Sequence, residues 1–419
     1  IPSGEPPLGV LACPEPEDRP DLWPTTARRT PDGELALGGL TVSEILADAP
    51  SPVFVLDEAD LRGRAASWSA AMAEEFWSGY GLRGGEAFYA GKAFLTTQVA
   101  RIVLQEGMGI DTASRVELAV GLAGLEKVDG PEATTHARRL GLHGNGKTPA
   151  EVTTAVRHRV GHLVIDSPEE VDHAVAAVHE LRRSGDFGAD ERARVMVRLT
   201  TGIHAGGHEY ISTAHEDQKF GLSVSTGAAR RAIDAIVAAD ELELAGLHSH
   251  IGSQILDMAG FREAVGVVLG LRHEIAVDTG HLCPEVDLGG GYGIAYTGAD
   301  PVVPSPAQVA RTLAEAVRET CERLGDEVPT VSIEPGRAVA GPTTVTLYTV
   351  TGLKRVELGE GASRLYVSID GGMSDNIRPA LYEAAYTALV ANRRPDPSAG
   401  LTRARVVGKH CESGDVVVR

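Results

Sequence analysis

Short apolar segments rich in β-branched residues alternate with longer segments of helical spacing between about residue 52 and residue 340. The helical segments place apolar residues three and four positions apart, as in Pro168–Arg183, Gly227–Ala238 and Ala307–Leu324. The strand-like segments between them are Glu86–Ala90, Gly107–Asp111, Ala137–His143, His162–Asp166, Arg194–Leu199, Leu244–His250, Glu285–Gly289 and Thr330–Glu334. Strands that are each followed by a helix are typical of a parallel (β/α)8 barrel. We therefore predict a TIM-like barrel over residues 51–340.

The alternation stops after residue 340. Thr343–Thr351, Arg364–Asp370 and Ala404–Lys409 predict strands without intervening helices. The N-terminal segment, residues 1–50, is rich in proline and contains one strand-like stretch, Glu34–Thr41. We predict a C-terminal β domain over residues 341–419 that a strand of the N-terminal segment joins. Because the last residues are strand-like, we expect this domain to be incomplete at its end.

Composition excludes several classes of function. The 39 Lys and Arg residues against 58 Asp and Glu residues give a formal net charge of −19, which disfavours nucleic acid and anionic membranes as partners. Apolar runs such as Ala264–Leu271 are far shorter than the roughly 20 residues that span a bilayer. The four cysteines lie far apart without a CxxC pair, which predicts reduced thiols, no metal site and a cytoplasmic location. We expect a small-molecule ligand.

The C-terminal ends of barrel strands are where functional side chains gather. Lys92 follows the first predicted strand between apolar neighbours, which desolvate its ammonium group and favour an amine nucleophile. Gly289–Gly291 follows the seventh strand and Gly336-Arg337 the eighth, a pattern typical of a phosphate site. Taken singly, a solvated surface lysine and a tight glycine turn are the simpler interpretations.

Together these groups complement pyridoxal phosphate, which needs an amine, a phosphate site, a carboxylate and a flat ring. Lys92 would hold the aldehyde as a Schiff base, Glu334 would pair with the pyridine nitrogen, and His250 would stack on the ring. Asp111 and His143, at the ends of the second and third strands, are predicted to line the same cofactor. The alternatives are a core histidine for His250 and a strand-end cap for Glu334.

Several motifs occur in one order along the chain: Tyr89–Phe94, His215–Gly221, His248–Gln254, Gly289–Gly293, Glu334–Arg337, Asp370–Pro379 and Cys411–Asp415. With them the sequence resembles the fold-type III pyridoxal-phosphate decarboxylases, and most closely the diaminopimelate decarboxylases of the actinobacterial type. The resemblance runs from about Pro52 to Arg419. It implies a barrel plus a β domain, arranged as in alanine racemase and ornithine decarboxylase.

The resemblance also implies a reaction and roles for further residues. The reaction is the decarboxylation of meso-2,6-diaminopimelate to L-lysine and CO2, the last step of lysine biosynthesis, in a homodimer with shared active sites. Cys411 would reach the site from the partner subunit as proton donor, and Glu412 would contact the distal amino group. The distal carboxylate would bind Arg337, Arg378 and Tyr382, and the cofactor phosphate would contact Ser253, Gly290, Gly291, Gly336 and Arg337.

Other functions stay open at this point. A decarboxylase of ornithine, lysine or arginine would use the same chemistry, although a monocarboxylate does not require the pair Arg337 and Arg378. A catalytically silent regulatory homologue is a second alternative, which is disfavoured by the joint retention of Lys92, His250, Glu334 and Cys411. A racemase on a similar barrel is a third, which the residues for a diacid make less favourable.

Overall fold

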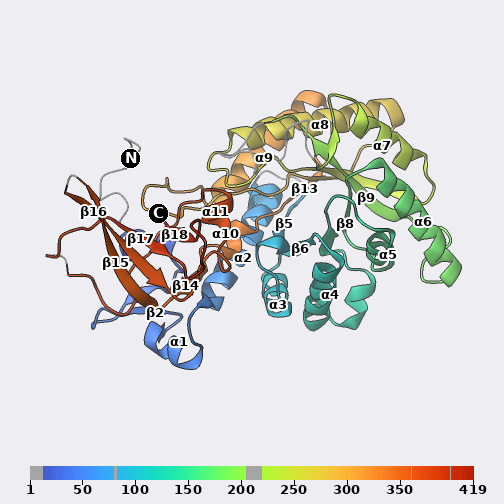
Figure 1. Ribbon diagram of the computed structural model, residues 1–419. Coiled ribbons are helices and arrows are strands. Elements are labelled where there is room, and N and C mark those ends of the chain that lie inside the picture. The colour runs from blue at the N-terminus through green and yellow to red at the C-terminus, as the bar shows by residue number, and fades with distance from the viewer. Residues whose placement is uncertain (1–12, 80–82, 204–218, 360, 397) are drawn as a thin grey trace. The chain divides into compact units, whose positions relative to one another are not determined.

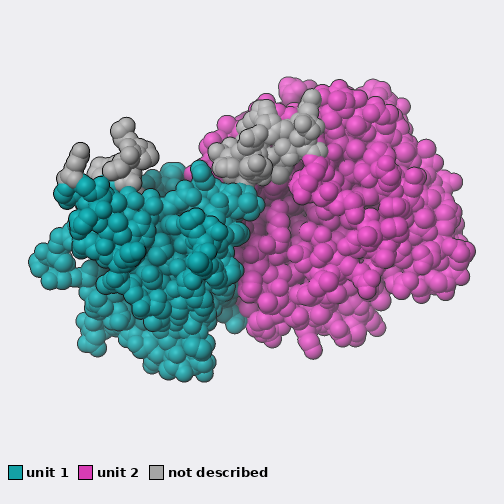
Figure 2. Space-filling model, in the orientation of Figure 1, with its two compact units in different colours: residues 1–61, 294–303, 341–419 teal, residues 62–293, 304–340 magenta. Residues whose placement is uncertain are grey.

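A computed structural model describes residues 13–79, 83–203, 219–359, 361–396 and 398–419 (Figure 1). The chain forms two compact units (Figure 2). The barrel unit comprises residues 62–293 and 304–340, and the β unit comprises residues 1–61, 294–303 and 341–419. Residues 215–218 of the motif His215–Gly221 lie outside the described residues.

The barrel unit contains a closed ring of eight parallel strands, so the predicted (β/α)8 fold is confirmed. Each strand pairs with its neighbours in the ring, and β13 pairs with β5 to close it. A short additional strand, β10 (Leu222–Ser223), pairs with β9 outside the ring. The ring strands in order are β5 (Gly85–Ala90), β6 (Gly109–Thr112), β7 (Leu140–Leu142), β8 (His162–Ile165), β9 (Ala193–Thr200), β11 (Leu242–Ser249), β12 (Glu285–Asp287) and β13 (Thr330–Ile333).

Apart from α2, which precedes the first ring strand, helices follow the ring strands along the chain and cover the outside of the barrel (Figure 1). Local sequence signals set their ends. Helix α9, for example, begins after Ser305, which forms a capping box with Gln308, and Pro306 occupies its first position. The helix ends at Gly325, which adopts the left-handed conformation. None of the described helices is apolar over a length that could cross a membrane. The helices are α2 (Glu58–Ala73), α3 (Thr97–Gln105), α4 (Arg115–Asp129), α5 (Pro149–Arg157), α6 (Pro168–Ser184), α7 (Ala228–Ala238), α8 (Ala259–Thr279), α9 (Pro306–Leu324) and α10 (Arg337–Ala340).

The third ring strand is shorter than predicted. It begins at Leu140 and not at Ala137. Arg139 lies before the strand, where its guanidinium pairs with Asp129 at 3.1 Å and donates to the carbonyl of Met108 at 2.9 Å. These contacts hold the Arg139 guanidinium outside the strand, because a charged side chain is costly inside the barrel wall.

A buried ion pair lies inside the barrel. His162 Nδ1 stands 3.5 Å from Asp287 Oδ2, and the two side chains are 6% and 0% exposed. The other carboxylate oxygen, Oδ1, accepts the backbone N–H of Gly289 at 2.8 Å. Burial by itself lowers the pKa of His162, but Asp287, with Asp111 and Glu285, outweighs it and raises the pKa to about 9. His162 is therefore an imidazolium at neutral pH.

This pair predicts a pH-dependent stability. The histidine pKa is raised above its ordinary 6.5, so its contribution is fully present below about pH 6.5 and is lost as the pH rises through about 9. We expect His162→Gln to cost up to about 3 kcal/mol of unfolding free energy at pH 6 and much less at pH 9.5. Urea unfolding at the two pH values measures this difference. His179→Gln, an exposed histidine near Glu241, is the control. An equal cost of His162→Gln at both pH values would contradict the prediction.

The described residues of the β unit form three small sheets. The largest has the order β15-β16-β17-β18, in which only β16 and β17 run parallel. Strand β4 pairs with β14, and β1, β2 and β3 form an antiparallel sheet. The elements are β1 (Arg28–Arg29), β2 (Leu35–Leu37), β3 (Leu40–Thr41), α1 (Val42–Asp48), β4 (Val53–Leu56), β14 (Thr344–Leu347), β15 (Val350–Gly359), β16 (Ala362–Ile369), α11 (Arg378–Leu381), β17 (Ala404–Val407) and β18 (Val416–Val418).

Two predicted strands are each divided in the structure. Glu34–Thr41 forms the hairpin of β2 and β3, because Gly38 and Gly39 adopt positive φ angles of 58° and 91° and turn the chain. Thr343–Thr351 contributes to β14 and to the start of β15, which belong to different sheets. Strand β4 falls inside the range expected for the barrel but pairs with β14 of the β unit.

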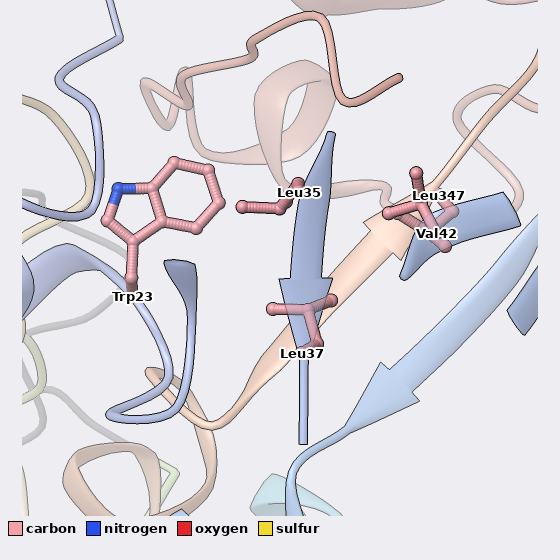
Figure 3. Packing of buried hydrophobic residues seen from close by; sticks show 5 residues of the cluster. All are labelled: Trp23, Leu35, Leu37, Val42 and Leu347. Atoms are coloured by element: carbon pink, nitrogen blue, oxygen red, sulfur yellow. The ribbon is translucent and has the colours of Figure 1, made fainter. Parts of the chain in front are cut away.

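An apolar core connects the N-terminal segment to the rest of the β unit (Figure 3). Trp23, Leu35, Leu37 and Val42 from the N-terminal segment pack with Leu347 of β14. The N-terminal segment is further attached by a hydrogen bond from the Leu35 N–H to the carbonyl of Ala391 at 2.7 Å. These contacts place residues more than 300 positions apart in one core, which no local pattern encodes.

Candidate active site

Ten of the residues predicted to bind a cofactor lie in the barrel unit, on or just after the C-terminal ends of ring strands. Lys92 follows β5, and Glu334, Gly336 and Arg337 follow β13. Since these strands are neighbours in the ring, the structure brings the groups to one rim. The other six are Asp111, His143, His250, Ser253, Gly290 and Gly291.

Lys92 occupies a single 3-10 turn, η4 (Gly91–Ala93), directly after β5. The buried Tyr89 fixes this turn, because its hydroxyl donates to the carbonyl of Phe94 at 2.6 Å. Solvent reaches the Lys92 side chain, yet the protein atoms crowded around it lower the pKa of its ammonium group. Glu334 and Asp111 oppose this shift, while Arg198 and Arg337 reinforce it. A lowered pKa is also what the apolar neighbours of Lys92 in the sequence predict.

Glu334 is a buried carboxylate held by two imidazoles. His248 Nε2 donates to its Oε1 at 2.8 Å, and His143 Nε2 lies 3.6 Å from the same oxygen. Burial by itself raises the pKa of Glu334, but His143 and His248 outweigh it and hold the pKa well below the usual range. The carboxylate is therefore ionised, as an acceptor for a protonated ring nitrogen must be.

His143 also contacts Asp111, with Nε2 3.1 Å from Oδ1. Burial lowers the pKa of His143, but Glu334 and Asp111 together raise it above its ordinary value. For Asp111, burial raises the pKa to about 6 against the opposing effect of His143. The site thus places the His143 imidazole between two carboxyl groups, and each of them favours its protonated form. Ligand atoms of His143, His248 and Glu334 lie within 4.8 Å of one another, a spacing that a metal ion could also bridge.

His250 is the neutral imidazole of the site. Its Nδ1 accepts the backbone N–H of Gly290 at 3.2 Å, which places the ring proton on Nε2. Burial first, and then the cations Lys92 and Arg198, lower its pKa well below 6.5. A neutral, buried and anchored ring is suited to stack on a flat aromatic ligand.

The glycine turn lies close against backbone atoms of neighbouring segments. A Cβ atom at Gly289, Gly290 or Gly291 would stand 2.2, 2.3 or 2.2 Å from a carbonyl oxygen of Ser249, Glu334 or Gly252, respectively. Gly336 is similarly close to Ala90, at 2.9 Å from its Cβ. Only glycine fits here, so the backbone itself forms this part of the rim.

Arg337 gathers two polar side chains of the loop after β11. Its Nη2 donates to Ser253 Oγ at 2.9 Å and its Nη1 donates to Gln254 Oε1 at 3.0 Å. The structure therefore joins the two segments from which the sequence predicts phosphate and carboxylate contacts.

The remaining predicted residues lie in the β unit. Arg378 begins α11, and its guanidinium lies over the ring of Tyr382 at 5.1 Å from the centroid. Cys411 and Glu412 are exposed. The backbone N–H of Gly414 lowers the pKa of the Glu412 carboxyl group. The structure thus pairs Arg378 with Tyr382 and presents Cys411 and Glu412 to solvent.

Two residues of the site received no role from the sequence. His248 holds Glu334, and Arg198 lies over the ring of Phe220 at 4.5 Å while lowering the pKa of Lys92 and His250. Both occupy the C-terminal half of a predicted ring strand, and that position was the available signal. Their orientation depends on partners from distant strands.

Comparisons with known proteins agree with this geometry. Residues 60–341 match the family model described as pyridoxal-dependent decarboxylase, pyridoxal binding domain. The diaminopimelate decarboxylase of Mycobacterium tuberculosis is 42% identical over 407 residues, which cover 96% of this chain and 84% of the relative. The enzyme of that name from Bacillus subtilis is 36% identical over 94% of this chain and 83% of its own length.

Solved structures of decarboxylases have the same fold as this chain. The diaminopimelate decarboxylase of M. jannaschii, also solved with L-lysine, has a TM-score of 0.81 at 26% identity and covers 94% of this chain and 84% of that one. A lysine/ornithine decarboxylase of Vibrio vulnificus shares the fold at 21% identity, with a TM-score of 0.65 over 90% of this chain and 87% of that one. The strand order and the residues of the barrel rim agree with the family match. The chain belongs to the pyridoxal-dependent decarboxylases and, within them, to the diaminopimelate decarboxylase family.

Proposed function

We propose that this chain decarboxylates meso-2,6-diaminopimelate to L-lysine and CO2 with pyridoxal phosphate, as the last step of lysine biosynthesis in the cytoplasm. The observation that carries the proposal is the convergence of Lys92, Glu334, His250 and the glycine turn at one barrel rim. It is supported by the 42% identity over 96% of the chain to enzymes of that name.

The residues of the rim fit pyridoxal phosphate. The turn Gly289–Gly291 provides a backbone cradle that any Cβ would fill, and Asp111 Oδ2 is buried without a hydrogen bond among the described residues. Lys92 would hold the aldehyde carbon, Glu334 the ring nitrogen, His250 one ring face, and Ser253 and Arg337 the phosphate. When bound, pyridoxal phosphate withdraws electrons from the carbon that loses CO2.

The protein's own groups account for the polarity of the site. His143 and His248 keep Glu334 ionised. The carboxylate can therefore accept a hydrogen bond from a protonated ring nitrogen and keep the proton on that nitrogen. The lowered pKa of Lys92 increases the fraction of free amine at neutral pH. The neutral His250 adds no charge beside the ring.

Substrate recognition requires separate charges for the end of the substrate that does not react. Arg337 and Arg378 are suited to its carboxylate because a guanidinium binds a carboxylate through two parallel hydrogen bonds. Tyr382 would support Arg378, which lies over its ring. We propose that Glu412 binds the distal ammonium, that Cys411 of a second copy donates the proton to the carbon, and that the protein works as a homodimer.

The test is to incubate purified protein and pyridoxal phosphate with meso-diaminopimelate and to measure L-lysine and CO2. We expect the two products in equal amounts. Ornithine, arginine and lysine should react about 10³-fold more slowly or worse in kcat/KM, since they leave the cations for the distal carboxylate without a partner. Faster turnover of one of these amino acids than of meso-diaminopimelate would assign the chain to that substrate. No turnover of any would overturn the proposal.

A further inference from the structure

A single buried carboxylate joins two loops of the β unit. Asp415 is 3% exposed. Its Oδ1 accepts the backbone N–H of Met373 at 2.6 Å, and its Oδ2 accepts the backbone N–H of His410 at 2.9 Å. Met373 belongs to the segment Asp370–Arg378, and His410 directly precedes Cys411. The carboxylate therefore bridges the segment that carries Arg378 and the segment that carries Cys411 and Glu412.

The backbone of Asp415 closes the turn that presents these two residues. Its N–H donates to the carbonyl of Glu412 at 3.0 Å, and its carbonyl accepts the N–H of Gly408 at 3.0 Å. Cys411 lies inside the loop that these bonds delimit. The exposed thiol and the exposed Glu412 carboxylate thus stand on a turn whose base is the buried Asp415.

Two glycines leave room for this carboxylate. A Cβ at Gly372 would lie 2.6 Å from Asp415 Oδ2, and a Cβ at Gly408 would lie 2.1 Å from the same oxygen. The two loops also touch beside the carboxylate: the Lys409 N–H donates to the carbonyl of Gly371 at 2.9 Å, and Ser374 Oγ lies 2.8 Å from His410 Nε2. The fit is tight enough that a longer side chain at position 415 has no space.

We propose that Asp415 is a positioning residue for the decarboxylation, which fixes the turn Cys411–Gly414 against the segment Asp370–Arg378 and thereby sets where the thiol and the Glu412 carboxylate stand. The inference rests on the proposed function, in which Cys411 supplies the proton. Asp415 does not itself touch the reacting atoms. It acts because a group misplaced by about 1 Å loses on the order of 10²-fold in rate.

Asp415→Asn is the most informative substitution. Asparagine has the same shape, but its amide nitrogen would face one of the two backbone N–H groups and could not accept from it. We expect kcat with meso-diaminopimelate to fall on the order of 10²-fold, while the cofactor absorbance stays close to that of the unaltered protein. Asp396→Asn is the matched control, because Asp396 also accepts a backbone N–H, from Ser398 at 2.8 Å, but is exposed.

A double-mutant cycle separates positioning from general destabilisation. Glu412 is proposed to bind the substrate, so its displacement should appear chiefly in KM. The loss of kcat should act through Cys411, and Asp415→Asn should therefore change kcat by no more than about twofold once Cys411→Ala is present. Additive losses in the double variant, or unchanged kcat in Asp415→Asn, would overturn the inference. If instead Cys411→Ala alone keeps full activity, the role of Cys411 in the proposed function is wrong, and the inference falls with it.

Two further measurements keep the inference testable if Asp415→Asn does not fold or if the wild-type protein has no activity. Ser374→Ala removes the neighbouring contact to His410 and should give a smaller loss of kcat in the same direction. The rate at which iodoacetamide alkylates Cys411, followed by peptide mass spectrometry, reports the placement of the thiol without any turnover. It should differ severalfold between Asp415→Asn or Ser374→Ala and the Asp396→Asn control, and equal rates would overturn the inference.

Discussion

Replacing Lys92 with alanine is expected to lower kcat for decarboxylation by about 10³-fold or more. The same variant should lose the visible absorbance that pyridoxal phosphate acquires when it is bound to a lysine. The physical reason is that Lys92 provides an amine of lowered pKa beside Glu334 and Asp111 at the barrel rim. Absorbance spectra and a lysine assay on the same samples measure both effects.

Two variants control this experiment. Lys127→Ala removes an exposed lysine from α4 and should leave both readouts unchanged. Lys92→Arg keeps the positive charge but not a free amine, so it should behave like Lys92→Ala. A Lys92→Ala protein that keeps its visible absorbance and its turnover would show that another amine holds the cofactor.

The second large effect is a recovery of activity on mixing inactive chains. Lys92→Ala and Cys411→Ala chains should each be nearly inactive as homodimers. If Cys411 serves the partner's site, random exchange of subunits makes half of the dimers mixed, each with one intact site of two. About a quarter of wild-type activity should therefore return. Exchange is verified by native mass spectrometry before the assay.

A matched mixture tests whether the recovery reports a shared site. Lys92 and Glu334 lie in the same barrel, so mixing Lys92→Ala with Glu334→Gln chains leaves every site of a mixed dimer with one defect. This mixture should recover no activity. No recovery with the Cys411→Ala chain after proven exchange would place the thiol in the site of its own chain or outside catalysis.

Much of the barrel can be predicted from the sequence because its signals are local. The capping box of α9 and the apolar spacing of its turns are readable within about 20 residues, and the predicted helix Ala307–Leu324 differs from the observed Pro306–Leu324 by one residue. The C-terminal ends of the ring strands also fall within two residues of the predicted ends. Since parallel strands end at one rim, the order of elements alone predicts that Lys92 and Glu334 meet.

The strand boundaries inside the β unit cannot be predicted from local signals in this way. The run Thr343–Thr351 has one continuous strand-like pattern, yet β14 pairs with β4 and β15 pairs with β16. Strand pairing depends on the partner's position in space, and the partner of β14 lies almost 300 residues earlier in the chain. A local pattern carries no information on such a choice.

The sequence by itself determined the class of fold, the residue types of the rim and the family to which they belong, because these depend on local periodicity and on motifs in a set order. Tertiary structure alone decided the states of those residues. Glu334 is ionised because His248 and His143 arrive from other strands. His250 is neutral because burial and then the cations Lys92 and Arg198 disfavour its protonation, and Asp415 is buried because two distant loops close over it. Charge, burial and hydrogen bonding act through space, so they depend on which segments the fold brings together.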